Sequence, residues 1–136
     1  MGLDMLLYAR NKQNPEQERT ICYWGKRWPI FAWFEKHLGE KIENGKEYIV
    51  SKEMFEEFRH DIASVIFAAT NYCFSREVTK YTFQKVAEQY FPVDAEDLCN
   101  QYDTYYVNNL IDTGNKIKIN GNIDFDSEEI IFIADW

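Results

Sequence analysis

The stretch from Ser51 to Thr70 constrains the fold more than any other part of this chain. Apolar side chains recur in it at steps of three and four residues, which is the stripe of an amphipathic helix. The stripe consists of Met54, Phe55, Phe58, Ile62, Val65, Ile66 and Ala69. Ser51 suits the N-cap, and Glu53 lies in the first turn, where the helix dipole favours an anion. The sequence therefore predicts a long helix that supplies part of a hydrophobic core.

The length and composition fit one folded domain over residues 1–136. The chain is 46% hydrophobic and 17% aromatic, which is ample for a core and argues against disorder. Its opening apolar run is too short for a signal peptide and is interrupted by Asp4, and no run is long enough to span a membrane. Three widely spaced cysteines, Cys22, Cys73 and Cys99, indicate reduced thiols in a cytosolic protein and offer no zinc site.

Two segments at opposite ends of the chain have the pattern of interior strands. Leu3–Arg10 and Ile130–Ala134 are apolar on both faces, which is typical of strands that lie inside a sheet. We expect the two to lie together in that sheet. A shorter segment, Tyr48–Val50, suits an edge strand just before the long helix.

A second helix is predicted before the long one. Pro29 fits the first turn of a helix that runs to Leu38, with Ile30, Phe31 and Phe34 on its buried side, and Gly39 fits the C′ position. Two segments lie ahead of it. Asn11–Arg19 is polar and lacks a period, so it predicts a loop, and Cys22–Trp28 suits either a short helix kinked at the proline or a loop.

The last third of the chain predicts two more helices and a hairpin. One helix spans Arg76–Tyr90, and the next starts at the N-cap Asp94 and ends at Gly114. After it, Ile117, Ile119, Ile123 and Phe125 share one face if a three-residue loop over 120–122 joins two strands. The predicted fold is therefore α+β: a small, mostly antiparallel sheet with an N-terminal strand, a C-terminal hairpin and a C-terminal strand, packed with about four helices.

The residues that most often perform catalysis do not form a recognisable motif. Glu57 and His60 make one half of a di-iron helix motif, but the second half is missing, so an exposed helix face explains them better. His37 suits a partner for the C-terminal dipole of its helix. There is no nucleophilic triad spacing, no GxGxxG and no phosphate loop. We therefore predict a protein that is not an enzyme, with no catalytic residue, no metal and no cofactor.

The stretch over residues 23–28 combines aromatic rings with cations. Trp24, Lys26, Arg27 and Trp28 form a candidate ligand site, because flat rings beside cations suit stacking a nucleobase and holding a phosphate. The alternative is that the tryptophans fill the core while the cations face water. Sequence alone leaves both interpretations open.

The charge of the chain is uneven. Residues 81–136 contain three basic and eleven acidic side chains, which accounts for the whole net charge of −8. This excess is either a solvated surface or a negative face that engages a basic groove in place of a nucleic-acid backbone. The candidate partner-binding residues are Asp94, Glu96, Asp97, Asp103, Asp112, Asp124, Asp126, Glu128 and Glu129. The net charge disfavours direct binding to nucleic acid or to an anionic membrane.

Several islands of sequence resemble a family of small phage and prophage proteins that begin MGLDMYLY. The first island is Met1-Gly2-Leu3-Asp4-Met5-x-Leu7-Tyr8, with Leu6 where the family tends to have tyrosine. The likeness returns at Tyr23-Trp24, Trp33-Phe34, residues 47–51 and residues 102–110, and it ends at Trp136. The chain differs at Pro29 and over residues 68–95, where it lacks a Gly-Phe-rich segment. The resemblance implies a mobile-element protein that acts in the cytoplasm of a bacterial host.

Two functions follow from this context. The first is a non-enzymatic inhibitor of a bacterial defence system, most concretely an anti-CRISPR protein whose acidic surface binds the basic nucleic-acid groove of an RNA-guided nuclease. The second is a sponge that sequesters a nucleotide immune signal with Trp24, Lys26, Arg27 and Trp28. The oligomeric state does not follow from the sequence.

Overall fold

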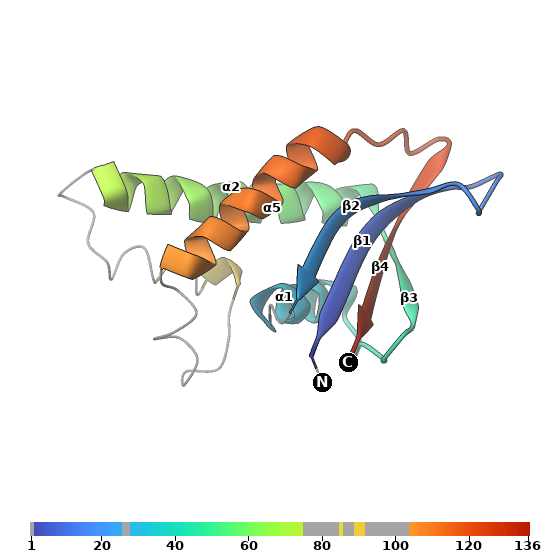
Figure 1. Ribbon diagram of the computed structural model, residues 1–136, viewed down its shortest axis with the longest axis horizontal. Helices are drawn as coiled ribbons and strands as arrows, with labels where there is room; N and C mark the ends of the chain where they lie inside the picture. The colour runs from blue at the N-terminus through green and yellow to red at the C-terminus, as the bar shows by residue number, and fades with distance from the viewer. Residues whose placement is uncertain (1, 26–27, 75–84, 86–88, 92–103) are drawn as a thin grey trace.

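The chain forms one antiparallel sheet with helices packed against it. The computed structural model describes residues 2–25, 28–74, 85, 89–91 and 104–136. Its elements are β1 (Asp4–Asn11), β2 (Glu18–Gly25), α1 (Trp28–Leu38), β3 (Glu47–Val50), α2 (Lys52–Phe74), α5 (Thr104–Asn120) and β4 (Glu128–Asp135). The strand order is β2-β1-β4-β3, and every neighbouring pair is antiparallel (Figure 1). The predicted α+β fold is confirmed.

The two strands predicted for the sheet interior do lie there, side by side. In the antiparallel register of β1 and β4, Met5 is opposite Ala134 and Leu7 is opposite Phe132. These four residues are buried, because the helices cover the face of the sheet to which they belong. The predicted edge strand at Tyr48–Val50 is also confirmed as β3, which pairs with β4 alone.

The prediction for residues 11–28 is wrong in its middle part. Instead of a short helix or a loop, the chain forms β2, and the loop before it spans only residues 12–17. The register between β1 and β2 shifts at Leu7 and Tyr8, so that Cys22 pairs with Leu7, Thr20 pairs with Tyr8, and Ile21 is the extra residue of a β-bulge. Both Ile21 and Cys22 are buried. This bulge breaks the alternation by which a strand is recognised.

Helix α1 begins and ends where its local signals predict, and α2 begins where its signals predict. Gly39 follows α1 with a φ of 72°, a conformation that glycine adopts without strain. Ser51 caps α2, since its Oγ accepts the Met54 N–H at 3.1 Å. Helix α2 continues to Phe74, four residues beyond the predicted end at Thr70.

The predicted hairpin after Gly114 is wrong. Helix α5 continues through Gly114 to Asn120, so Ile117 and Ile119 are helical. Gly114 is present because α5 crosses closely over α2: a Cβ added there would lie 3.1 Å from Ile66 Cδ1 and 3.6 Å from Ile62 Cγ2. Gly121 ends the helix instead, with its N–H donating to the Ile117 carbonyl at 2.7 Å.

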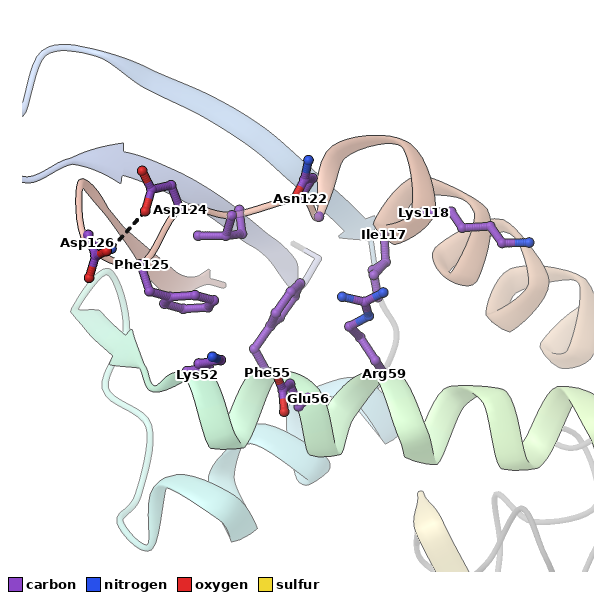
Figure 2. Close-up of a pocket in the computed structure, with 12 residues that line it drawn as sticks. Lys52, Phe55, Glu56, Arg59, Ile117, Lys118, Asn122, Asp124, Phe125 and Asp126 are labelled. Carbon is purple, nitrogen blue, oxygen red and sulfur yellow. Dashed lines mark hydrogen bonds between the residues drawn. The ribbon is translucent and has the colours of Figure 1, made fainter.

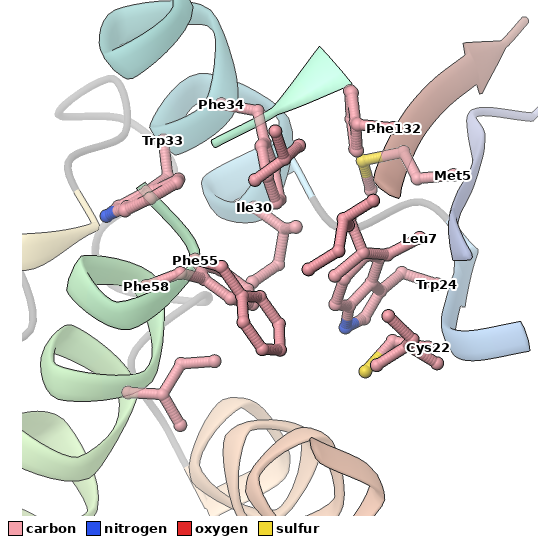
Figure 3. Close-up of a cluster of buried hydrophobic side chains, with 14 of the residues drawn as sticks. Met5, Leu7, Cys22, Trp24, Ile30, Trp33, Phe34, Phe55, Phe58 and Phe132 are labelled. Carbon is pink, nitrogen blue, oxygen red and sulfur yellow. The ribbon is translucent and has the colours of Figure 1, made fainter. Parts of the chain in front are cut away.

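Aromatic side chains dominate the core between the sheet and the helices (Figure 3). The Phe34 ring stacks on Phe132 of β4, with centroids 4.1 Å apart. The Phe58 ring of α2 meets Trp33 and Phe34 of α1 at 4.8 and 5.0 Å. Two predictions cannot be followed in the structure, because the helix predicted over Arg76–Tyr90 and the helix start predicted at Asp94 lie mostly outside the described residues.

Candidate functional site

A groove follows the crossing of α2 and α5. Its first part, the polar hollow, measures about 650 Å³ and lies between the start of α2, the end of α5 and residues 121–126. Lys52, Phe55 and Arg59 border it from α2, and Phe125 borders it from the segment that leads to β4 (Figure 2). Such a volume is in the range of small-molecule sites.

The second part of the groove is apolar. This apolar hollow measures about 420 Å³ and is bordered by Ile66, Phe67 and Ile111, among others. The Phe67 side chain is 68% exposed, so its ring is open to a ligand. Arg59, Ile117 and Lys118 border both hollows, so two cations lie where the polar and apolar parts meet.

The basic side chains of the groove are available to a ligand. None of Lys52, Arg59 and Lys118 forms an ion pair within the part of the chain that the structure describes. The Arg59 guanidinium lies 5.8 Å from the centroid of the Phe55 ring, a cation–π contact, and its N–H groups donate to no other described residue. Arg59 extends from α2 toward Ile117 of α5 (Figure 2).

Among the described residues, the acidic side chains of the groove border only the polar hollow, where Glu56 is on α2 and the other two come from the segment that leads to β4. Asp124 and Asp126 are on the turn before β4, on the opposite side of the view from Lys118 (Figure 2). The Asp124 carboxylate accepts the Asp126 N–H and the Ser127 hydroxyl, both at 3.1 Å, and so holds the turn together. Within the part of the chain that is described, the apolar hollow is therefore bordered by two cations and no carboxylate, whereas the polar hollow is bordered by side chains of both charges.

The predicted acidic face is partly neutralised by ion pairs. Asp94, Glu96, Asp97 and Asp103 lie outside the described residues. The other five are placed, and three of them have a basic partner: Glu129 contacts Arg10 at 3.4 Å, Glu128 contacts Arg19 at 3.2 Å, and Asp112 contacts Lys116 at 3.1 Å.

The Asp124 carboxylate is engaged in hydrogen bonds within its own turn. Asp126 is exposed, and its carboxylate makes no hydrogen bond or ion pair within the described residues. The five placed residues therefore do not form one continuous unpaired surface.

The ligand site predicted at Trp24, Lys26, Arg27 and Trp28 cannot use the Trp24 ring. Trp24 is only 2% exposed, and its indole N–H donates to the Thr113 hydroxyl at 2.8 Å. Its ring packs against Phe34 and Phe58 in the core, so a nucleobase has no room to stack there. Lys26 and Arg27 lie outside the described residues, as does the side chain of Trp28. For Trp24, the interpretation as a core residue holds.

His37 lies near two carboxylates of α2, Glu57 and Asp61, a grouping that the sequence does not suggest. His37 Nε2 from the last turn of α1 lies 3.4 Å from Glu57 Oε1 of α2, and Asp61 is one turn further along α2. One potential ligand atom from each of these three residues lies within 4.8 Å of the others. His60 contacts the same Asp61 carboxylate, with Nδ1 3.3 Å from Oδ1.

Sequence reasoning missed both groupings, because each joins residues far apart in the chain. Arg59 and Lys118 border the same groove only because α5 crosses α2. Gly114 permits the crossing, whereas its local pattern predicts a helix end. His37 meets Glu57 through the packing of α1 on α2. One signal was available: a glycine flanked by Leu110 and Ile117 at helical spacing is typical of a close helix contact.

Comparison with known proteins gives no relative. No family model, no curated protein and no solved structure matches this chain. Among the described residues, none of the helices has both the length and the apolar character needed to cross a membrane.

Proposed function

We propose that this protein acts by binding, and that the α2–α5 groove holds an anionic ligand with a flat apolar body, of which a nucleotide is the best-fitting class. One observation supports this most: Arg59 and Lys118 lie, without ion-pair partners in the described part of the chain, where an apolar and a polar hollow meet. These two cations favour an anion at that junction, because the described carboxylates of the groove border the polar hollow alone.

Each part of the groove matches one part of a nucleotide. The exposed Phe67 ring suits a stacked base, a contact worth about 1–3 kcal/mol per base in proteins that bind single strands. The Arg59 guanidinium can hold a phosphate through two parallel hydrogen bonds, and Lys118 adds a point charge. Lys52 lies further along the polar hollow and suits a second phosphate.

The context comes from the resemblance to phage and prophage proteins. A protein of that kind that binds a nucleotide tightly would act as a sponge, removing an immune signal of its bacterial host. The proposed ligand is still a nucleotide, as predicted for residues 23–28. Its proposed binding residues are now Arg59, Phe67 and Lys118.

Thermal unfolding with a panel of mononucleotides and cyclic dinucleotides tests this proposal. A ligand at 100 times its Kd stabilises the folded protein by about 2.7 kcal/mol. Arg59→Gln and Lys118→Gln should each remove most of that stabilisation. Lys36→Gln is the matched control, because Lys36 is an exposed lysine of α1 that does not border the groove. No stabilisation by any nucleotide, or equal stabilisation of all variants, would contradict the proposal.

A second candidate function is inhibition of an RNA-guided nuclease through the acidic C-terminal part. The observation that favours it is the net charge of −8 within residues 81–136. Complementary charge speeds association with a basic groove and helps to select the partner. Glu128, Glu129 and Asp112 are ion-paired, and the Asp124 carboxylate holds its turn together. The remaining candidates are Asp94, Glu96, Asp97, Asp103 and Asp126.

A pull-down from host lysate, followed by mass spectrometry, tests the second candidate. It predicts a single stoichiometric nuclease that is released by salt. Reversing Glu96, Asp97 and Asp126 to lysine should abolish capture, while Lys36→Glu should leave it unchanged. Glu128 is best left intact, because its reversal would also break its pair with Arg19. If the triple variant still captures the nuclease, the acidic surface is not the binding surface.

A further inference from the structure

We infer that His37, Glu57 and Asp61 form a binding site for one divalent transition-metal ion, with Zn²⁺ as the best-fitting ion. The three residues come from two packed helices, and one ligand atom of each lies within 4.8 Å of the other two. Imidazole and carboxylate together are a common ligand set for Zn²⁺. The inference is independent of the nucleotide proposal, because none of the three residues borders the α2–α5 groove.

The histidine is already oriented as a metal ligand. His37 Nδ1 lies 2.8 Å from the Trp33 carbonyl oxygen, which can only accept, so Nδ1 must hold the proton. In the neutral form of the ring, the Nε2 lone pair then faces Glu57 Oε1, 3.4 Å away. Metal-bound histidines usually donate their other N–H to such an oxygen, which fixes the ring. Two facing acceptors need a cation between them, either a proton or a metal ion.

The buried carboxylate is held in place by its own partners. Asp61 is 6% exposed, and its Oδ2 accepts the Trp33 indole N–H at 2.8 Å. The same Trp33 ring stacks on His37, with centroids 3.7 Å apart and planes at 14°. Trp33 therefore positions two of the three ligands at once, as residues around a metal site typically do.

The third ligand leaves the site open to solvent. The Glu57 side chain is 56% exposed, whereas those of His37 and Asp61 are 17% and 8% exposed. An ion can therefore enter from the Glu57 side, and Glu57 can move to close the ligand distances. Three protein ligands leave a fourth position of a tetrahedral ion for water. The imidazole favours Zn²⁺ over Mg²⁺ and Ca²⁺, which prefer oxygen ligands.

Isothermal titration of the untagged full chain with ZnCl₂ tests this inference, with Co²⁺ absorption as a second readout. We expect one equivalent to bind, and His37→Asn and Glu57→Gln to weaken binding by more than about 100-fold, since loss of a second-shell partner alone costs about 10–100-fold. Glu56→Gln is the matched control, an adjacent exposed glutamate outside the cluster, and should bind like the native chain.

Two results would overturn the inference. One is no Zn²⁺ binding by the native chain, in which case the cluster is a His37–Glu57 ion pair. The other is stoichiometric binding that persists in both variants, or a Co²⁺ spectrum with thiolate charge-transfer bands, which would assign the ion to cysteines. Glu57 is exposed, so Glu57→Gln is expected to fold, and a circular dichroism spectrum of each variant checks this.

Discussion

Helix α2 packs against two other helices in different ways. Against α1 it uses large rings and a buried polar link: Phe58 meets Trp33 and Phe34, and Asp61 accepts the Trp33 indole N–H. Against α5 it uses aliphatic side chains that close on Gly114. The first contact fills the space between the helices, whereas the second leaves the α2–α5 groove beside it. One helix thus provides both a rigid core contact and an open ligand surface.

Truncating a side chain at the contact between α1 and α2 should lower the stability of the protein most. Phe58 is fully buried among the rings of Trp24, Trp33, Phe34 and Phe91. Phe58→Ala therefore leaves a cavity that these rigid rings cannot fill. We expect the free energy of unfolding to fall by about 3–5 kcal/mol, measured by urea denaturation. Phe67→Ala, on the groove side, should change it by less than about 0.5 kcal/mol. Similar losses in the two variants would remove the contrast.

Removing the hydrogen bond between Trp33 of α1 and Asp61 of α2 should cause the second-largest loss of stability. Trp33→Phe keeps a ring against Phe58 but leaves the buried Asp61 carboxylate without its indole donor. A hydrogen bond to a charged group contributes about 1.5–3 kcal/mol, and we expect a loss of that size in urea denaturation. The double variant Trp33→Phe, Asp61→Leu should be more stable than the single one if the unsatisfied carboxylate is the cause.

The α5 side can be tested by enlarging Gly114. Gly114→Leu places a side chain where even a Cβ would lie 3.1 Å from Ile66 Cδ1, and overpacking of this kind costs about 1–3 kcal/mol. Ile66→Ala in the same chain should recover part of the loss, because it vacates that space. The unfolding free energies of the two single variants and the double variant, measured together, give the coupling. Strict additivity would mean that the two helices do not meet there.

The smallest expected change in stability comes from the ionisation of Cys22, which lies in β2 on the side of the sheet that α5 covers. Burial raises the pKa of the Cys22 thiol from 9.0 to about 12. Above pH 9 the unfolded chain therefore loses a proton that the folded chain keeps, so stability present at lower pH is lost as the pH rises. From pH 8 to pH 10 the native chain should lose about 1 kcal/mol more unfolding free energy than Cys22→Ala, since one pKa unit corresponds to about 1.4 kcal/mol. An equal loss in both chains would mean that this side of the core admits water.

The parts of the fold that local signals determine are the parts that the sequence predicts. Pro29 and Gly39 bound α1, Ser51 caps α2, and the apolar runs of β1 and β4 indicate interior strands. Each signal lies within the element that it defines. Such elements can be identified without knowing what packs against them.

The wrong predictions share a cause that is not local. Gly114 has the same chemistry in a helix end and in a helix crossing, and only the position of Ile66 on another element decides between them. Ile21 disturbs the period of β2 because of a bulge against β1. The groove and the His37 cluster are also formed by pairs of elements, so no single stretch of sequence indicates them.

The pairing of β1 with β4 has a consequence for synthesis of the protein. Asp4 pairs with Asp135, so the two central strands of the sheet come from the first and last parts of the chain. During translation, β1 can pair with β2, which follows it directly, but its other edge stays unpaired until β4 leaves the ribosome. Contacts between such distant residues slow folding, and an exposed strand is prone to pair wrongly. Moving the β4 segment ahead of β1 by circular permutation should therefore allow the sheet to form earlier on the ribosome.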